Sequence, residues 1–252
     1  VLQLYINDEF FDKPREDNAY LTVANPNLNI VYEDENILLA DKPQGLLVHP
    51  DKNEYGDTLI ARIQRYLYEK GEYRPEDENS FRPALANRID RNTGGIVIAA
   101  KNAEALRILC DKIKQRELEK RYLAVVHGTP EKKEATLEGF LEKNAEQNRV
   151  YLKTKKTDAA LTIKTRYRVI ESRNGLSLLD IALLTGRTHQ IRAQMAAAGY
   201  PLLGDGKYGK LDKQYDRKIQ ALYSYKLTFC FTTDSGSLAY LNGKTFQVAD
   251  VS

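Results

Sequence analysis

The 252-residue sequence predicts an α+β fold, in which a mostly antiparallel mixed sheet with flanking helices surrounds a central cleft. Two observations support this fold class. Strand-like segments follow one another between residues 134 and 185, and helical periodicity is confined to a few short stretches. A doubly wound fold would instead alternate strands with helices along the chain.

Strands and helices both occur in the first half of the chain. Residues 30–43 are predicted as two strands joined at Glu33–Asn36. In residues 57–71 the apolar side chains recur at helical spacing, with Asp57 as the candidate N-cap and Gly71 at the end.

A buried strand and a second helix come next. The apolar run at 95–100 is typical of a buried strand, and Asn102 can cap the helix after it. One face of that helix carries the apolar residues Leu106, Leu109, Cys110 and Ile113. Residues 122–126 are predicted as another strand.

The second half of the chain is mostly strand. Four strands are expected in residues 134–185, with Asn174-Gly175 as the tight hairpin between the last two. Thr188 is the candidate cap of a short helix that ends at Gly199. The C-terminal segments are again strand-like, over 221–231 and 237–248.

Residues 1–24 are predicted as a short appendage to a main domain of residues 25–252. They contain two strand-like stretches, 2–7 and 19–24, around a polar loop. No basic and apolar leader opens the chain, and its apolar runs are far too short to cross a bilayer. We therefore expect a monomeric cytoplasmic protein with no membrane partner.

The few cysteines and histidines argue against a metal site. Cys110 and Cys230 lie far apart, without the spacing of metal ligands, and both are interpreted as buried, reduced thiols. The three histidines are equally scattered.

The cationic residues are unevenly distributed, although the net charge is only +3. Residues 151–169 carry six cations and one acid, and residues 112–121 carry five cations and two acids. Such clusters are typical of proteins that bind polyanions. Charge alone fits solvated lysine-rich surfaces equally well.

Asp90 lies between Arg88 and Arg91, directly before the turn-forming residues 92–95. In a surface loop this would be an exposed ion pair worth about 0–1 kcal/mol. In a cleft, the neighbouring cations would keep the carboxylate ionised, as a nucleophile or base requires.

A second polar cluster follows the strand that precedes Thr188. Gly186 allows a sharp exit from the strand, and the helix start can bind an anion or an RNA edge. The polar residues gathered there are Arg187, His189, Gln190 and Arg192. The alternative is a basic helix start on a solvated surface.

Two further segments can be read in more than one way. Tyr122 begins a buried strand, where it is either a half-buried aromatic or a face that stacks on a base. GDGKYG at 204–209 matches a dinucleotide-binding pattern, but it has no preceding strand and no acid about 20 residues later. Its glycines are therefore expected to shape a tight loop.

Four segments together resemble the successive motifs of the RluA-like pseudouridine synthases. They are DKPQGLLVHP (41–50), NRIDRNTGGIVIAAK (87–101), KRYLAVVHG (120–128) and LLTGRTHQIRAQMAAAGYPLLGDGKYG (183–209). They occur in the family's order, and the resemblance spans roughly residues 30–250. Residues 1–24 faintly resemble the end of a small RNA-binding module that often precedes this domain.

The resemblance implies the pseudouridine synthase fold and an RNA substrate, with no cofactor and no metal. Asp90 would be the catalytic aspartate, Tyr122 the active-site tyrosine and Arg192 the cation that pairs with Asp90. The expected RNA contacts are Arg88, Arg187, His189, Gln190 and Lys42. Large-subunit ribosomal RNA is the expected substrate, and transfer RNA is the alternative.

Three positions depart from the usual family motifs. Asn87 and Ile89 stand in the usual His-Arg-Leu-Asp, Gly94 in the usual Thr-Ser-Gly, and Gln194 replaces a frequent histidine. A catalytically silent RNA-binding protein and another RNA-modifying enzyme, such as a methyltransferase, remain the competing classes. The sequence leaves open whether Asp90 attacks the sugar or removes a proton first.

Overall fold

The computed structural model describes residues 19–23, 25–51, 54, 56–77, 80–144, 146–147, 149–209, 213–249 and 251. The strand predicted at residues 2–7 therefore lies outside the described residues. The division of the chain at residue 24, the monomeric state and the cytoplasmic location stay predictions.

The described residues form one mixed sheet with three α-helices and short 3-10 turns, which confirms the α+β prediction. The strands are β1 (Asn29–Glu33), β2 (Ile37–Lys42), β3 (Ala84–Leu85), β4 (Gly94–Ala100), β5 (Leu118–His127), β6 (Glu134–Asn144), β7 (Arg149–Lys153), β8 (Leu161–Arg173), β9 (Leu176–Leu183), β10 (Leu222–Phe229) and β11 (Thr245–Gln247). The helices are α1 (Leu59–Glu69), α2 (Ala103–Lys114) and α3 (Gln190–Ala197).

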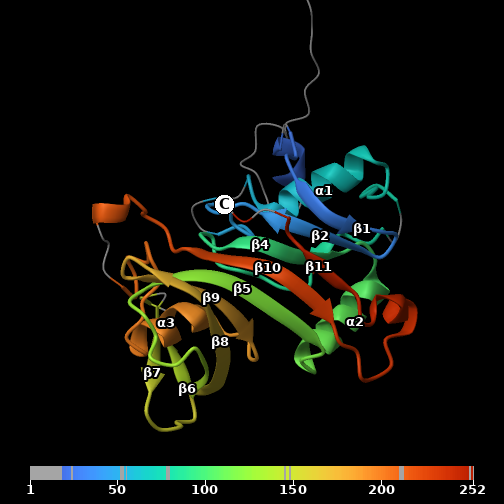
Figure 1. The fold of residues 1–252 in the computed structure, drawn as a ribbon. Helices are drawn as coiled ribbons and strands as arrows, with labels where there is room; N and C mark the ends of the chain where they lie inside the picture. Colours follow the sequence, from blue (N-terminus) through green and yellow to red (C-terminus); the bar gives the residue numbers. More distant parts are fainter. Residues whose placement is uncertain are drawn as a thin grey trace, which may run out of the picture.

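The sheet runs β1-β2-β4-β10-β5-β9-β8-β6-β7, with β3 beside β4 and β11 beside β10 (Figure 1). Among the named strands of the described residues, every pairing is antiparallel except that of β4 with β10, where Gly95 lies opposite Ser224. A Cβ atom on Gly95 would come within 2.1 Å of the Ser224 carbonyl oxygen, and Gly95 has φ +111°. Only glycine permits this approach, so the second glycine of NTGG allows the two halves of the sheet to join.

Two hydrophobic cores lie on opposite faces of the sheet. Val97 of β4 points into a core shared with α1, whereas Ile98 points into a core shared with α2. Successive residues of a strand face opposite sides, and both sides of β4 are covered, so β4 is buried throughout, as its apolar run predicts. Figure 1 shows β5 and β10 crossing the middle of the molecule, with α3 and β6–β9 to one side.

Several local predictions are confirmed. The hairpin at Asn174-Gly175 has positive φ at both residues, +54° and +76°, as a two-residue turn of this kind requires. Asn102 caps α2 by accepting a hydrogen bond from the Ala105 N–H at 2.8 Å. Gly71 follows α1 with φ +75°.

Some predicted details of the helices are wrong. The N-cap of α1 is Thr58, because the Asp57 carboxylate binds Arg62 instead. Helix α2 buries Ala105, Ile108, Leu109 and Lys112, a face rotated from the predicted one. Cys110 is consequently exposed, and Cys230 is exposed just after β10, so neither thiol is buried as expected.

Two segments predicted as strands contain 3-10 turns. Residues Ala19–Thr22 form one such turn, and Tyr20 packs against Tyr73 with ring centroids 5.5 Å apart. Residues Gly236–Leu241 form another before the short strand β11. No helix among the described residues is long and apolar enough to cross a bilayer, and none of their His, Cys, Asp and Glu residues group as metal ligands would.

Candidate active site

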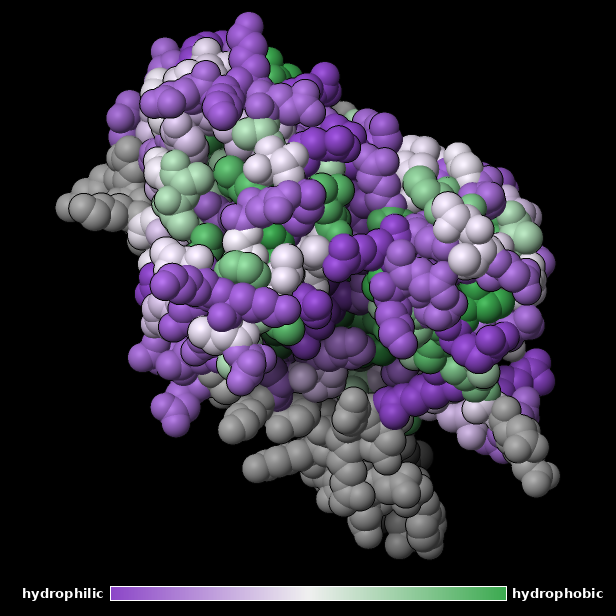
Figure 2. All heavy atoms as spheres, turned by 90° about the horizontal axis from the view of Figure 1, so that it is seen from below, coloured by the Kyte–Doolittle hydropathy of each residue, from purple (hydrophilic) through white to green (hydrophobic). Residues whose placement is uncertain are grey.

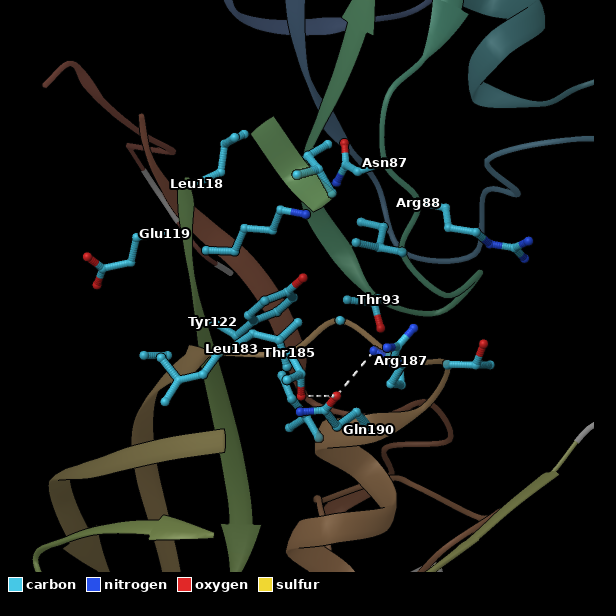
Figure 3. Close-up of a pocket in the computed structure, with 18 of the residues that line it drawn as sticks. Asn87, Arg88, Thr93, Leu118, Glu119, Tyr122, Leu183, Thr185, Arg187 and Gln190 are labelled. Carbon is cyan, nitrogen blue, oxygen red and sulfur yellow. Dashed lines mark hydrogen bonds between the residues drawn. The ribbon is translucent and has the colours of Figure 1, made fainter. Parts of the chain in front are cut away.

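A cleft of about 910 Å³ lies between three segments of the described chain. They are the connection from β3 to β4, the start of β5 and the connection from β9 to α3. Figure 2 shows a face of the molecule on which hydrophilic residues border a hollow between two lobes. In the close-up of the cleft, Asn87, Tyr122 and Thr185 each come from one of these three segments (Figure 3).

Asp90 lies in a turn between β3 and β4. The Thr93 N–H donates to the Asp90 carbonyl at 3.0 Å, which closes the turn. The Asn87 side chain accepts from the Ile98 N–H at 2.8 Å and anchors the segment to β4. The Asp90 side chain lines the cleft and is 24% exposed, so a substrate can reach its carboxylate.

Lys42 is buried next to the turn that carries Asp90 and supports it. It is fully buried, and its ammonium donates to the carbonyls of Pro43, Leu46 and Arg91 at 2.8–2.9 Å. These acceptors take the place of water around the cation, and burial lowers the pKa of Lys42 to about 7. The prediction that Lys42 contacts RNA is wrong, because its amine is enclosed by backbone carbonyls.

Arg192 projects from α3 and binds two carboxylates at once. Its Nη1 donates to Asp90 Oδ2 at 3.0 Å. On the other side, its Nε and Nη2 donate to the two oxygens of Asp205 at 2.7 and 2.9 Å. The planar guanidinium matches a carboxylate in this two-point geometry, so Asp205 fixes the orientation from which Arg192 reaches Asp90.

Asp205 was not identified as a site residue from the sequence, although it lies in the GDGKYG loop. Its side chain is 1% exposed and also accepts from the backbone N–H groups of Lys207 and Tyr208. Burial pushes the pKa of Asp205 upward, but the bonds from Arg192 outweigh it and hold the pKa below its usual range. A lone acid inside a tight glycine loop was the available signal.

His189 flanks Asp90 from an unusual backbone position. His189 itself is the N-cap of α3, with φ +52° and no capping bond from its side chain, so the predicted cap Thr188 is wrong. The ring Nδ1 lies 2.9 Å from the Tyr208 hydroxyl, and Nε2 lies 3.7 Å from Asp90 Oδ2. Burial lowers the pKa of His189, so its ring is neutral near pH 7.

Gln190 holds the β9–α3 connection together. Its Oε1 accepts from the Thr185 hydroxyl at 2.9 Å and from the Arg187 N–H at 3.2 Å (Figure 3). Its Nε2 donates to the Lys164 carbonyl and the Thr165 hydroxyl. With its side chain 2% exposed and its carboxamide fully engaged, Gln190 is not available to RNA, and that prediction is wrong.

Tyr122 lies on the floor of the cleft. It is buried within the core on the α1 side, yet its ring lines the cleft beside Ile89 and Leu222. Burial raises the pKa of Tyr122 to about 12, and the nearby Asp90 charge acts in the same direction. Tyr122 is therefore a neutral phenol near pH 7.

Exposed cations border the cleft. Arg88, in the connection from β3 to β4, and Arg187, in the connection from β9 to α3, both line the cleft (Figure 3). Both residues are exposed. Arg166 of β8 lines the cleft as well. Lys155 and Lys156, from the most basic stretch of the sequence, are exposed between β7 and β8 but do not line the cleft.

Comparison with known proteins gives a consistent result. Residues 36–197 match the family model described as RNA pseudouridylate synthase. The ribosomal large subunit pseudouridine synthase D of Borreliella burgdorferi is 32% identical over 217 residues, which cover 86% of this chain and 65% of that protein. An uncharacterized RNA pseudouridine synthase of Mycoplasma capricolum is 34% identical over 250 residues, covering 96% of this chain and 78% of that protein. The structure of human RNA pseudouridylate synthase domain containing 4 has the same fold, with a TM-score of 0.69 at 17% identity over 92% of this chain and 91% of that one.

Proposed function

The chain belongs to the RNA pseudouridylate synthase family, and from that premise we propose that it isomerises uridine in RNA to pseudouridine with Asp90 as the reactive carboxylate. The observation that supports this most is the Arg192–Asp90 contact of 3.0 Å inside the cleft. A protein that only binds RNA would gain nothing from a carboxylate in this cleft, because the negative charge of the carboxylate repels phosphates.

The reaction exchanges one bond between the base and the ribose for another. The N1–C1′ bond breaks, a C5–C1′ bond forms, C5 loses a proton and N1 gains one. A carboxylate can bond to a carbon of the nucleotide or accept a proton only in its ionised form. Arg192 binds the Asp90 carboxylate and aligns it, while Asp205 keeps Arg192 in place.

We propose that the Tyr122 ring stacks on the target base. A uridine must leave its stack to reach Asp90, which costs a few kcal/mol, and an aromatic ring on the cleft floor can receive the base. Its raised pKa keeps the phenol protonated near pH 7, so its hydroxyl is suited to donate a hydrogen bond rather than to accept a proton.

Tyr122→Phe is expected to keep RNA affinity within about twofold and to lower the single-turnover rate by about 10²-fold. The ring face that receives the base remains, and only the hydroxyl is lost. Rates and dissociation constants should be measured on the same RNA. Tyr215→Phe, which removes a hydroxyl bonded to the Asn174 carbonyl, is the matched control. A Tyr122→Phe enzyme with wild-type turnover would limit Tyr122 to stacking.

The substrate we propose is large-subunit ribosomal RNA, with Arg88, Arg187 and Arg166 contacting phosphates along the cleft rim. The Borreliella relative is named for that RNA. Lys155, Lys156 and Lys207 are proposed as further phosphate contacts, and Lys210 lies outside the described residues. Residues 1–24 are proposed as part of a small RNA-binding module.

Incubating the protein with large-subunit ribosomal RNA and with total transfer RNA, followed by mapping of pseudouridine at single-nucleotide resolution, tests this substrate. We expect new sites in the ribosomal RNA alone. Pseudouridine found only in the transfer RNA would support the proposed reaction and contradict the proposed substrate. Absence of pseudouridine in both RNAs would contradict the proposed function.

A further inference from the structure

Lys120 lies in the cleft two residues before Tyr122. Alternate residues of a strand point to the same side, and both side chains line the cleft. In the ladder between β5 and β10, Lys120 lies opposite the buried Leu227, and Tyr122 lies opposite Ser224. Leu118 and Leu227 belong to the core on the α2 side, and Tyr122 belongs to the core on the α1 side. Along β5, Lys120 therefore lies between a residue of each apolar core.

Among the described residues, the buried cations Lys42, Lys112 and Arg192 have partners, whereas the half-buried Lys120 has none. Lys112 pairs with Glu117 at 2.8 Å, Lys42 donates to three carbonyls, and Arg192 binds two carboxylates. Across the part of the chain that the structure describes, no acceptor lies within hydrogen-bonding distance of the Lys120 ammonium. Burial is the sole cause that lowers the pKa of Lys120 to about 8, which agrees with the lack of any neighbouring counter-charge.

An ammonium held in apolar surroundings without an acceptor destabilises the folded protein. Lys120 is less exposed than Arg88 and Arg187 at the rim, so its ammonium is less well hydrated than theirs. Lys120 lines the cleft, so a molecule bound there can supply the acceptor that the described protein residues do not. Strongly perturbed groups that face a cleft are frequent at functional sites.

We propose that Lys120 binds an anionic oxygen of the RNA substrate inside the cleft, an inference that rests on the proposed function. Two oxygens can fill this role. One belongs to a phosphate beside the extruded nucleotide. The other is a carbonyl oxygen of the target uracil, which gains negative charge when the N1–C1′ bond breaks and its electron pair stays with the base.

The experiment compares Lys120→Met and Lys120→Arg with the wild type and with the control Lys226→Met. Lys226 lies on the neighbouring strand opposite Arg121 and does not line the cleft. Methionine keeps most of the stem of Lys120 and removes its charge, so the melting temperature of Lys120→Met should equal or exceed that of the wild type. RNA dissociation constants between 50 and 200 mM salt and saturated single-turnover rates are measured for every protein.

A charge-assisted hydrogen bond lost from the complex should weaken binding or slow turnover by about tenfold or more in Lys120→Met. If the oxygen is a phosphate, the dissociation constant rises and the slope of log K against log salt falls by about 0.7–0.9. If it is the uracil oxygen, the saturated rate falls and the dissociation constant stays unchanged. Lys120→Arg should recover most of either loss, and Lys226→Met should match the wild type.

A wild-type RNA dissociation constant together with a wild-type single-turnover rate in Lys120→Met would overturn the proposal. Lys120 would then line the cleft without contacting the substrate. Failure of the proposed function would look different, because the wild type itself would then form no pseudouridine. In that case only the RNA dissociation constants test the role of Lys120, and an unchanged RNA affinity in Lys120→Met overturns it.

Discussion

Asp90→Asn is expected to abolish pseudouridine formation while RNA affinity stays within about threefold of the wild type. The substitution keeps the size of the side chain and removes the charge that a nucleophile or base needs. A loss of about 10³-fold or more in the single-turnover rate is the expected scale for the reacting group of an enzyme. RNA affinity should survive, because the cations that border the cleft are untouched.

The measurement pairs single-turnover pseudouridine formation with a binding titration on the same RNA. Asp111→Asn is the matched control, since Asp111 is exposed on α2 and accepts a bond from Gln115. Turnover of Asp90→Asn within tenfold of the wild type would remove Asp90 from the chemistry. Unchanged turnover together with weakened binding would make Asp90 a binding residue.

Arg192→Met is expected to lose both activity and stability. The reason for the stability loss is Asp205, which is 1% exposed and bound to Arg192 at two points. Without Arg192, the buried carboxylate of Asp205 keeps its charge and loses its partner, which typically costs about 3–5 kcal/mol of unfolding free energy. Urea denaturation measures this loss.

A double variant separates the two effects of Arg192. Asp205→Asn removes the orphaned charge, so Arg192→Met/Asp205→Asn should regain much of the unfolding free energy that Arg192→Met loses. Its activity should remain absent, because Asp90 still lacks its cation. Recovery of turnover in the double variant would mean that Arg192 acts only through stability, and the proposed pairing of Arg192 with Asp90 would fall.

Local patterns in the sequence predict much of the fold. Strand alternation, the helical spacing in α1 and the Asn174-Gly175 turn each depend on a few neighbouring residues, and each is present in the structure. The sequence could also single out Asp90 and Arg192, since both lie in distinctive motifs. Their contact joins segments 102 residues apart and emerges only in the folded chain.

The misassigned polar residues have a common physical cause. Lys42 and Gln190 lie in the same motifs as the candidate catalytic residues, and the sequence cannot tell a polar group that meets substrate from one that meets the backbone. Both turn out to bind the loops that carry the site. Asp205 was missed for the converse reason, because its partner Arg192 comes close only through the tertiary fold.

The most direct test of the account is tritium release from large-subunit ribosomal RNA labelled at C5 of uridine, without added cofactor. The account predicts that the wild type releases one tritium for each pseudouridine formed, and that Asp90→Asn, which still binds the RNA, releases none above background. Equal release by Asp90→Asn and the wild type would contradict the central role of Asp90. Absence of release by the wild type on every RNA tested would contradict the isomerase activity itself.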